Sequence, residues 1–190
     1  DVVDRGSNKK SKPKITNKDI PKKYPSGSEL IVQVTKGPIG TKGPRVTTNV
    51  LLPGRFLVLL PNSEQSGVSR KIENKEERSR LKKIVRELNI PDGMGIIIRT
   101  AGEGQRKAYF IRDLAMLIES WNQITERVHN QKGGSCVFEE PDLIERTVRD
   151  VLTEDIERIV VDNSTEADRV KELIGRVSKR TIEKVHRYNY

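Results

Sequence analysis

The segment Gly93-Met94-Gly95-Ile96-Ile97-Ile98-Arg99-Thr100-Ala101-Gly102 carries the most structural information in this chain. Its apolar run, Ile96 to Ile98, predicts a β-strand at 96–99 that is bounded by glycines. The strand ends on Arg99 and Thr100. A guanidinium fork, a hydroxyl and nearby backbone N–H groups together suit a phosphate. The sequence therefore predicts a candidate anion site at the end of this strand.

The regions on either side of this strand predict an α+β arrangement. Strands are expected at 30–34 and 47–52, on either side of the turn Gly40-Thr41-Lys42-Gly43-Pro44-Arg45-Val46-Thr47-Thr48, and at 55–60. Asn74, with Glu77 three residues later, has the spacing of a capping box and predicts a helix over 74–89. A second, longer helix is expected from six apolar residues at helical spacing: Phe110, Leu114, Leu117, Trp121, Ile124 and Val128.

The chain after Gly133-Gly134 alternates between the two element types. The pattern predicts a strand at 136–138 with Cys136 buried in it, a helix at 141–152, a strand at 158–162, a helix at 164–177 and a strand-like tail at 181–188. Pro141 fits the first turn of its helix, and Ser164 fits an N-cap. This alternation is typical of an α/β unit, so we place a boundary near 131–135. Because the tail stops within an element, we expect the chain to be a fragment of a longer protein.

Positive charge is concentrated in the first part of the chain. Residues 1–71 contain 14 Lys and Arg against 5 Asp and Glu, whereas residues 72–190 contain 22 of each. A local positive field favours an anionic polymer as partner. A basic solubilising tail is the alternative that composition leaves open. Residues 1–29 have few apolar positions and predict a basic flexible arm or linker.

Several classes of site and location are disfavoured by the sequence. One cysteine provides neither a disulfide framework nor a zinc site, and the two histidines are far apart. No apolar run approaches the ~18 residues of a membrane-spanning helix, and no signal peptide is recognisable. These features lead us to expect a cytoplasmic protein.

From about Leu30 to Tyr190, some 85% of its length, the chain resembles the ribonuclease E/G family of bacterial endoribonucleases. Several separate blocks carry the resemblance in the family's order. They are Ile31–Lys36, the turn from Thr41 to Thr48, Phe56–Pro61, Ser69–Glu73, Gly93–Gly102, Leu152–Asp155 and Ile159–Asp162.

The resemblance implies a division into domains. It makes 30–53 the C-terminal strands of an OB-fold RNA-binding barrel, 54–132 a 5′-sensor domain and 133–190 part of an RNase H-like domain. The magnesium-dependent nuclease domain would follow Tyr190. The earlier barrel strands, with their base-stacking aromatics, have no counterpart here. Each stacked base contributes ~1–3 kcal/mol, so we expect this chain alone to bind single-stranded RNA weakly.

The resemblance also assigns roles to individual residues. Arg99 and Thr100 correspond to the side chains that hold a 5′-terminal monophosphate, with main-chain contributions near Gly54 and Val58. The alternative for Arg99 is a strand-end residue paired with an acid such as Glu103.

Four further cations are expected to contact RNA. Lys36 and Lys42 correspond to barrel cations that follow the RNA backbone, and Arg45 and Arg70 are additional phosphate contacts. The alternative for each is a solvated surface charge.

We expect no catalytic residue and no metal ligand in this chain. Asp162 ends an apolar strand, where RNase H folds often place a metal ligand, and Glu139 and Asp142 lie near another strand end. Asp162 also fits the turn before a helix, and the family's RNase H-like domain lacks the chemistry. Magnesium is therefore expected only in the intact enzyme.

Two functions remain open from the sequence. The first is the RNA-binding, 5′-monophosphate-sensing portion of a single-strand-specific endoribonuclease, a hydrolase of ribosomal RNA processing and messenger RNA decay. The second is a non-catalytic nucleic-acid-binding or scaffold protein. The expected partner is single-stranded RNA, preferentially 5′-monophosphorylated, and any homo-oligomer would form through parts of the protein outside this chain.

Overall fold

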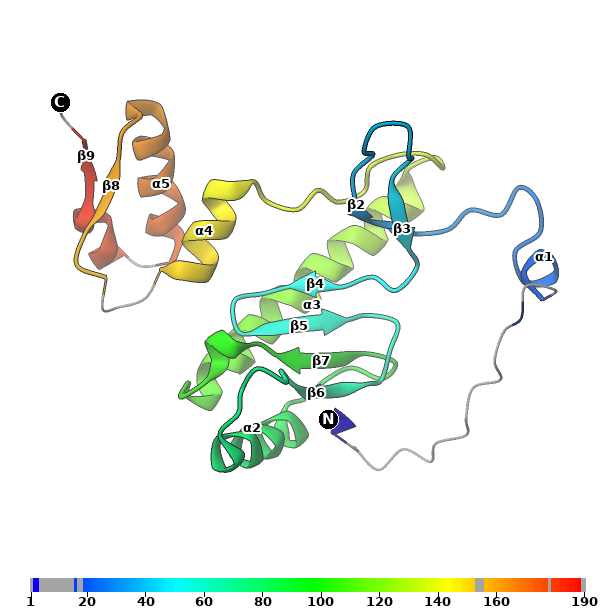
Figure 1. The fold of residues 1–190 in the computed structure, drawn as a ribbon, viewed down its shortest axis with the longest axis horizontal. Coiled ribbons are helices and arrows are strands. Elements are labelled where there is room, and N and C mark those ends of the chain that lie inside the picture. The colour runs from blue at the N-terminus through cyan, green and yellow to red at the C-terminus, as the bar shows by residue number, and fades with distance from the viewer. Residues whose placement is uncertain (1, 4–15, 17–18, 153–155, 178, 189–190) are drawn as a thin grey trace. The chain divides into compact units, whose positions relative to one another are not determined.

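The computed structural model describes residues 2–3, 16, 19–152, 156–177 and 179–188. The chain divides into two compact units, residues 1–137 and 138–190. Figure 1 shows the elements of both units. The fold is mixed α and β, as expected, and no sheet within the described residues closes into a barrel. The four named domain ranges stay predictions.

The first unit is built on a five-stranded sheet with the strand order β1-β6-β7-β5-β4. Its strands are β1 (Val2–Val3), β4 (Leu52–Pro53), β5 (Leu57–Leu60), β6 (Ser66–Val68) and β7 (Gly95–Ile98). β6 and β7 run parallel, and the other neighbouring strands run antiparallel. The strands expected at 55–60 and 96–99 are confirmed as β5 and β7. The sequence did not predict β6, because Ser66-Gly67-Val68 contains a single apolar side chain.

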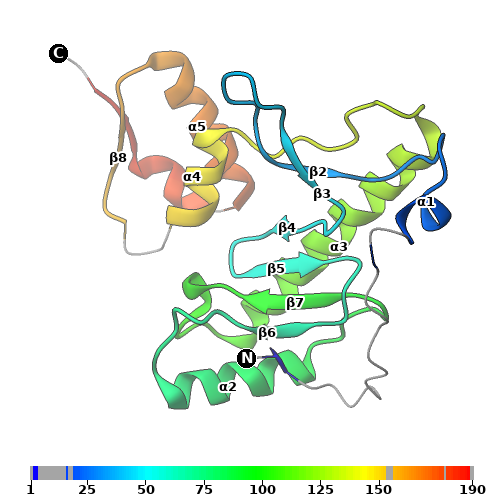
Figure 2. The ribbon, with the colours of Figure 1, turned by 45° about the vertical axis from the view of Figure 1, so that its right-hand side comes forward.

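Two helices pack against this sheet (Figures 1 and 2). α2 (Lys75–Glu87) contacts β6 and β7, and α3 (Lys107–Asn130) contacts β4 and β5. The side chain of Asn74 caps α2, since its Oδ1 accepts hydrogen bonds from the backbone N–H groups of Glu76 at 2.9 Å and Glu77 at 3.0 Å. Both helices expected from sequence are confirmed.

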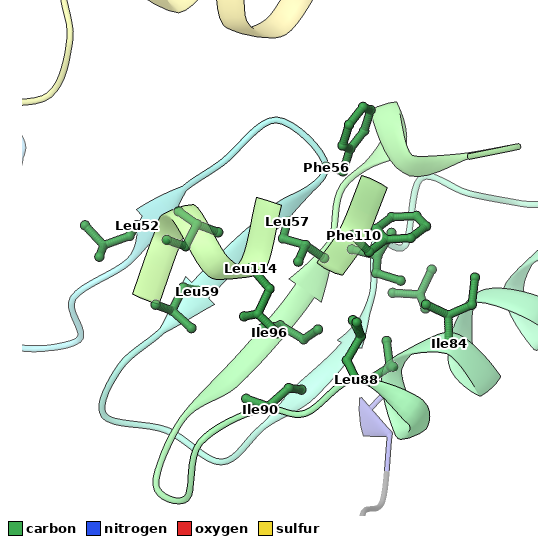
Figure 3. Packing of buried hydrophobic residues seen from close by; sticks show 14 of the residues in the cluster. Leu52, Phe56, Leu57, Leu59, Ile84, Leu88, Ile90, Ile96, Phe110 and Leu114 are labelled. Atoms are coloured by element: carbon green, nitrogen blue, oxygen red, sulfur yellow. The ribbon is translucent and has the colours of Figure 1, made fainter. Parts of the chain in front are cut away.

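The core lies between the sheet and these helices (Figure 3). Alternate residues of the central strands are buried, as the two-residue period of a strand requires: Leu57 and Leu59 from β5, Ile96 and Ile98 from β7. They pack with apolar residues of α2 and α3, among them Leu81, Val85, Phe110 and Leu114. In contrast, Val58 is half-buried and Ile97 is exposed, so the opposite face of the sheet is more open.

A separate hairpin precedes the sheet. β2 (Gln33–Lys36) and β3 (Arg45–Thr47) pair antiparallel and form a sheet of their own. Its side chains are mostly exposed, including Val34 and Val46. Of residues 30–53, which were expected to form the end of a barrel, 33–47 form this two-stranded hairpin. The strand expected at 47–52 is interrupted: residues 48–51 are not in a strand, and Leu52 begins β4 of the five-stranded sheet. Most of the arm expected at 1–29 lies outside the described residues, which include α1 (Ile20–Lys23).

In the second unit, α5 (Ser164–Val177) packs on a two-stranded parallel sheet, and α4 (Leu143–Val151) packs against α5. The strands of this sheet are β8 (Ile159–Val161) and β9 (Val185–Arg187), with a 3₁₀ segment, η2 (Lys179–Lys184), before β9. Leu152, Val170, Ile174 and Val185 form its buried core. The helices and the strand expected at 158–162 are confirmed, whereas the strand-like tail is a 3₁₀ turn followed by a short strand.

Three local expectations for this part of the chain are wrong. Residues 135–140 have no regular secondary structure, and Cys136 is exposed rather than buried in a strand. α4 is capped by Asp142, whose carboxylate accepts the N–H of Glu145 at 3.0 Å, so Pro141 lies before the helix. Asn163, not Ser164, caps α5 through a bond from the N–H of Glu166. In each helix the capping side chain belongs to a neighbour of the residue that we singled out: Asp142 follows Pro141, and Asn163 precedes Ser164. Asn and Asp are favoured at the N-cap position.

Candidate functional site

Three neighbouring strands bring the expected phosphate-binding residues to the same end of the five-stranded sheet, where β5 begins and β6 and β7 end. Leu57, the first residue of β5, lies opposite Ile98, the last residue of β7, and Ile98 also pairs with Val68 at the end of β6. Two backbone bonds extend this register: Arg99 N–H donates to the Phe56 carbonyl, and Ser69 N–H to the Ile98 carbonyl, each at 2.8 Å. We call this end of the sheet the Arg99 edge and define it as residues 54–56, 69–70 and 99–100.

Arg99 is half-buried at this edge. Its Nη1 donates a hydrogen bond to the backbone carbonyl of Gly54. A guanidinium carries five N–H donors in a fixed fork, and this bond uses one of them. The bond ties the guanidinium to the Gly54 loop. The side chain of Arg99 is therefore partly enclosed by the Gly54 loop.

Thr100 is exposed and begins a 3₁₀ turn, η1 (Thr100–Gly102). Gly102 closes the turn by donating its N–H to the Arg99 carbonyl at 3.0 Å. A Cβ at this glycine would lie 2.8 Å from side-chain atoms of Ile98 and Phe110, so a side chain does not fit there without a shift of the core. Gly102 is buried, whereas Thr100 and Ala101 are exposed, so Thr100 lies at the surface next to Arg99.

The loop before β5 is held by a carboxylate that the sequence analysis did not identify. Asp113 of α3 is 9% exposed. Its Oδ1 accepts the N–H of Arg55 at 3.1 Å, and its Oδ2 accepts the N–H groups of Phe56 and Leu57, each at 2.8 Å. The available signal was a charged residue on the apolar stripe of the predicted helix, three residues after Phe110.

Gly54 lies against this carboxylate. An added Cβ would lie 2.6 Å from Asp113 Oδ2, so only glycine fits without displacing the aspartate. The N–H of Gly54 donates to the Leu57 carbonyl at 2.8 Å. In this conformation, the N–H groups of residues 54–57 all donate within the protein, and Gly54 contributes its carbonyl to Arg99. Val58 lies in β5 opposite Ile97 of β7, with its side chain half-buried.

A charged pair on α2 holds the turn that follows Thr100. Glu77 accepts the N–H of Gly104 at 2.8 Å and two bonds from Arg80, at 2.6 and 2.7 Å. Arg80 also donates to the Gln105 carbonyl at 3.0 Å. The hydrogen bonds from the Arg80 guanidinium, followed by the one from the Gly104 N–H, hold the pKa of Glu77 below its ordinary value against the opposing effect of burial.

The four cations expected to contact RNA lie in two places. Lys36, Lys42 and Arg45 are exposed on the β2–β3 hairpin, where Lys36 and Arg45 are direct cross-strand partners. Like charges in facing positions repel each other, and an anion between them relieves that repulsion. Arg70, also exposed, belongs instead to the Arg99 edge, two residues beyond the end of β6.

The remaining candidates do not form a metal site. Asp162 is exposed between β8 and α5, and Asp142 caps α4. Among the described residues, no three His, Cys, Asp or Glu side chains converge in a way that could hold a metal ion. These side chains do not fit magnesium, and we derive no hydrolytic step from them. No helix in the described ranges is long and apolar enough to cross a membrane.

Comparisons with known proteins agree with the resemblance seen in the sequence. A profile of the Ribonuclease E/G family matches residues 51–190, which include the whole Arg99 edge. The chain is 39% identical over 146 residues to "Ribonuclease E" of a Nostoc species, covering 77% of this chain and 21% of that protein. It is 41% identical over 148 residues to "Ribonuclease G" of Escherichia coli, covering 78% of this chain and 30% of that protein. The chain thus spans between a fifth and a third of these relatives' length. It belongs to the ribonuclease E/G family.

Proposed function

We propose that this chain is the RNA-binding and 5′-monophosphate-sensing portion of a single-strand-specific bacterial endoribonuclease that acts in RNA processing and decay. The observation that carries the proposal is that Arg99, Thr100 and the Gly54 loop lie together at the Arg99 edge. The names of the relatives support a ribonuclease, and the exposed hairpin cations support an RNA partner.

The chemistry of the Arg99 edge suits a terminal phosphate. A 5′-monophosphate carries more negative charge than an internal phosphodiester and offers three terminal oxygens. A planar guanidinium can bind two of these oxygens, and the Thr100 hydroxyl can donate to another. A 5′-hydroxyl end offers none of these contacts. The site would therefore distinguish RNA ends and would not itself cut RNA.

The hairpin has a different role in this proposal. Lys36, Lys42 and Arg45 follow the phosphates of a single strand and attract RNA of any sequence, since contacts to phosphate carry no sequence information. We assign magnesium-dependent hydrolysis to other parts of the intact protein, and we place that protein in the bacterial cytoplasm. Any oligomer would form through those other parts.

Arg99→Ala tests the sensor. The chain is titrated with one short single-stranded RNA bearing either a 5′-monophosphate or a 5′-hydroxyl, at low salt and without magnesium. We expect the wild-type chain to prefer the phosphorylated RNA and Arg99→Ala to bind both equally. The variant should fold with a lowered melting temperature, because the Gly54 carbonyl loses a charged donor worth roughly 1.5–3 kcal/mol.

Arg86→Ala is the matched control. It removes an exposed arginine near the end of α2 and should keep the wild-type preference. Equal binding of the two RNAs by the wild-type chain would contradict the sensor assignment, as would a preference that survives in Arg99→Ala.

A further inference from the structure

Asp113 connects helix α3 to the loop that orients Arg99. Its carboxylate accepts three backbone N–H groups, from Arg55, Phe56 and Leu57, and it is almost fully buried. A carboxylate removed from water requires such compensation, because burying an unpaired charge is costly. These three N–H donors come from consecutive residues, so one carboxylate holds the whole start of β5.

The same loop presents its carbonyl groups to Arg99. The Gly54 carbonyl accepts the Arg99 guanidinium, and the Phe56 carbonyl accepts the Arg99 backbone N–H at 2.8 Å. The loop therefore donates hydrogen bonds to the Asp113 carboxylate through its N–H groups and accepts hydrogen bonds from Arg99 through its carbonyl groups. Hydrogen-bonded chains of this kind polarise one another and strengthen each bond.

We propose that Asp113 is a positioning residue for the phosphate site: by fixing the loop 54–57, it sets the direction of the Gly54 carbonyl and hence the plane of the Arg99 guanidinium. This inference rests on the proposed sensor function. Asp113 does not contact the RNA and acts only through Gly54 and Arg99. A purely structural role, tying α3 to the sheet, would predict lost stability with unchanged recognition.

Asp113→Asn is the decisive variant. Asparagine keeps the size of the side chain but replaces one acceptor oxygen with an NH₂ donor. That donor would face loop N–H groups, so the loop must shift. Leu117→Ala is the control. Leu117 is buried one turn further along the same helix, so this variant weakens the core while Asp113 stays in place.

Two quantities are measured on the full 190-residue chain at a temperature where each variant is folded. The first is the ratio of affinities for 5′-monophosphate and 5′-hydroxyl RNA. The second is the Nε–Hε resonance of Arg99, which reports the guanidinium's surroundings without RNA. We expect Asp113→Asn to reduce the ratio roughly tenfold, as losses of outer partners do at metal sites, and to shift the resonance. Leu117→Ala should lower the melting temperature and leave both unchanged.

The outcomes separate the two proposals. A wild-type preference that survives in Asp113→Asn, with an unshifted Arg99 resonance, overturns the role of Asp113 alone. Equal losses of preference in Asp113→Asn and Leu117→Ala at equal losses of stability also overturn it. A wild-type chain without preference overturns the sensor itself. If Asp113→Asn does not fold, Asp113→Glu, which keeps the charge but moves it by one methylene, decides through the same two readouts.

Discussion

The Arg99 edge and the β2–β3 hairpin both carry cations, but they are built differently. The Arg99 edge rests on the core: Leu57 and Ile98, which begin β5 and end β7, are fully buried. Its loops are held by side chains from α2 and α3: Arg78 donates to the Ser69 carbonyl, and Asp113 accepts the Phe56 N–H. The hairpin has exposed apolar residues, and the side chain of Gln33 ties it to the chain before β4 through two bonds to Leu51, at 2.9 and 3.0 Å.

This difference corresponds to two kinds of recognition. Distinguishing a terminal phosphate from a hydroxyl requires donors held in fixed directions, and a rigid core supplies them. Attracting the backbone of any single strand requires only charge near the surface, and long exposed side chains supply that. We therefore expect substitutions at the Arg99 edge to alter specificity and stability, and substitutions in the hairpin to alter affinity and its dependence on salt.

The largest contrast should come from two glycines. Gly54→Ala places a Cβ 2.6 Å from the Asp113 carboxylate, and this overpacking should destabilise the chain by roughly 1–3 kcal/mol. Gly43→Ala, in the hairpin, meets no heavy atom within 4 Å and requires no positive φ, so its effect should stay within about 0.5 kcal/mol. Urea denaturation of both variants measures the difference. Equal effects would mean that the Gly54 loop yields to the new methyl group and is not rigid.

The hairpin lysines should change the salt dependence of binding. Replacing Lys36 and Lys42 together with alanine should weaken binding to both RNA forms by the same factor. It should also lower the slope of log affinity against log salt by about 1.4, since each phosphate contact on a single strand contributes roughly 0.7. The control is the double variant Lys83→Ala, Arg86→Ala, which removes two exposed charges from α2. An unchanged slope would identify both hairpin lysines as solvated surface charges.

The smallest expected effect concerns pH and the α2 pair. The folded-state pKa of Glu77 lies below its ordinary value of 4.5, chiefly because of the Arg80 hydrogen bonds. The ionised Glu77 side chain therefore makes its full contribution to stability above pH 4.5. This contribution is lost as the pH falls through the lower, folded-state pKa. The difference in melting temperature between wild type and Glu77→Gln should shrink from pH 6 to pH 3.

Glu76→Gln is the control for this titration, because it removes an exposed carboxylate from the same turn of α2. It should keep the wild-type pH dependence. A difference between wild type and Glu77→Gln that stays constant with pH would show that the carboxylate charge of Glu77 does not stabilise the turn at Gly104.

Local patterns in the sequence determined the central strands of the large sheet and the four longer helices. Short continuous apolar runs predicted β5 and β7, the helical spacing from Phe110 to Val128 predicted α3, and Asn74 marked the start of α2. These features depend on residues a few positions apart, so they can be recognised in a single sequence. The same reasoning was wrong at Cys136, where a short apolar run between polar residues forms no strand.

Tertiary structure alone decided how the candidate site is assembled. The bond from Arg99 to Gly54 joins residues 45 positions apart, and those from the loop to Asp113 join residues 56 to 58 positions apart. Neither a period nor a local motif records such pairings, because they follow from the order of strands in the sheet and the packing of α3 on it. The sequence supplied the cations, the glycines and the carboxylate, and the fold decided which of them meet.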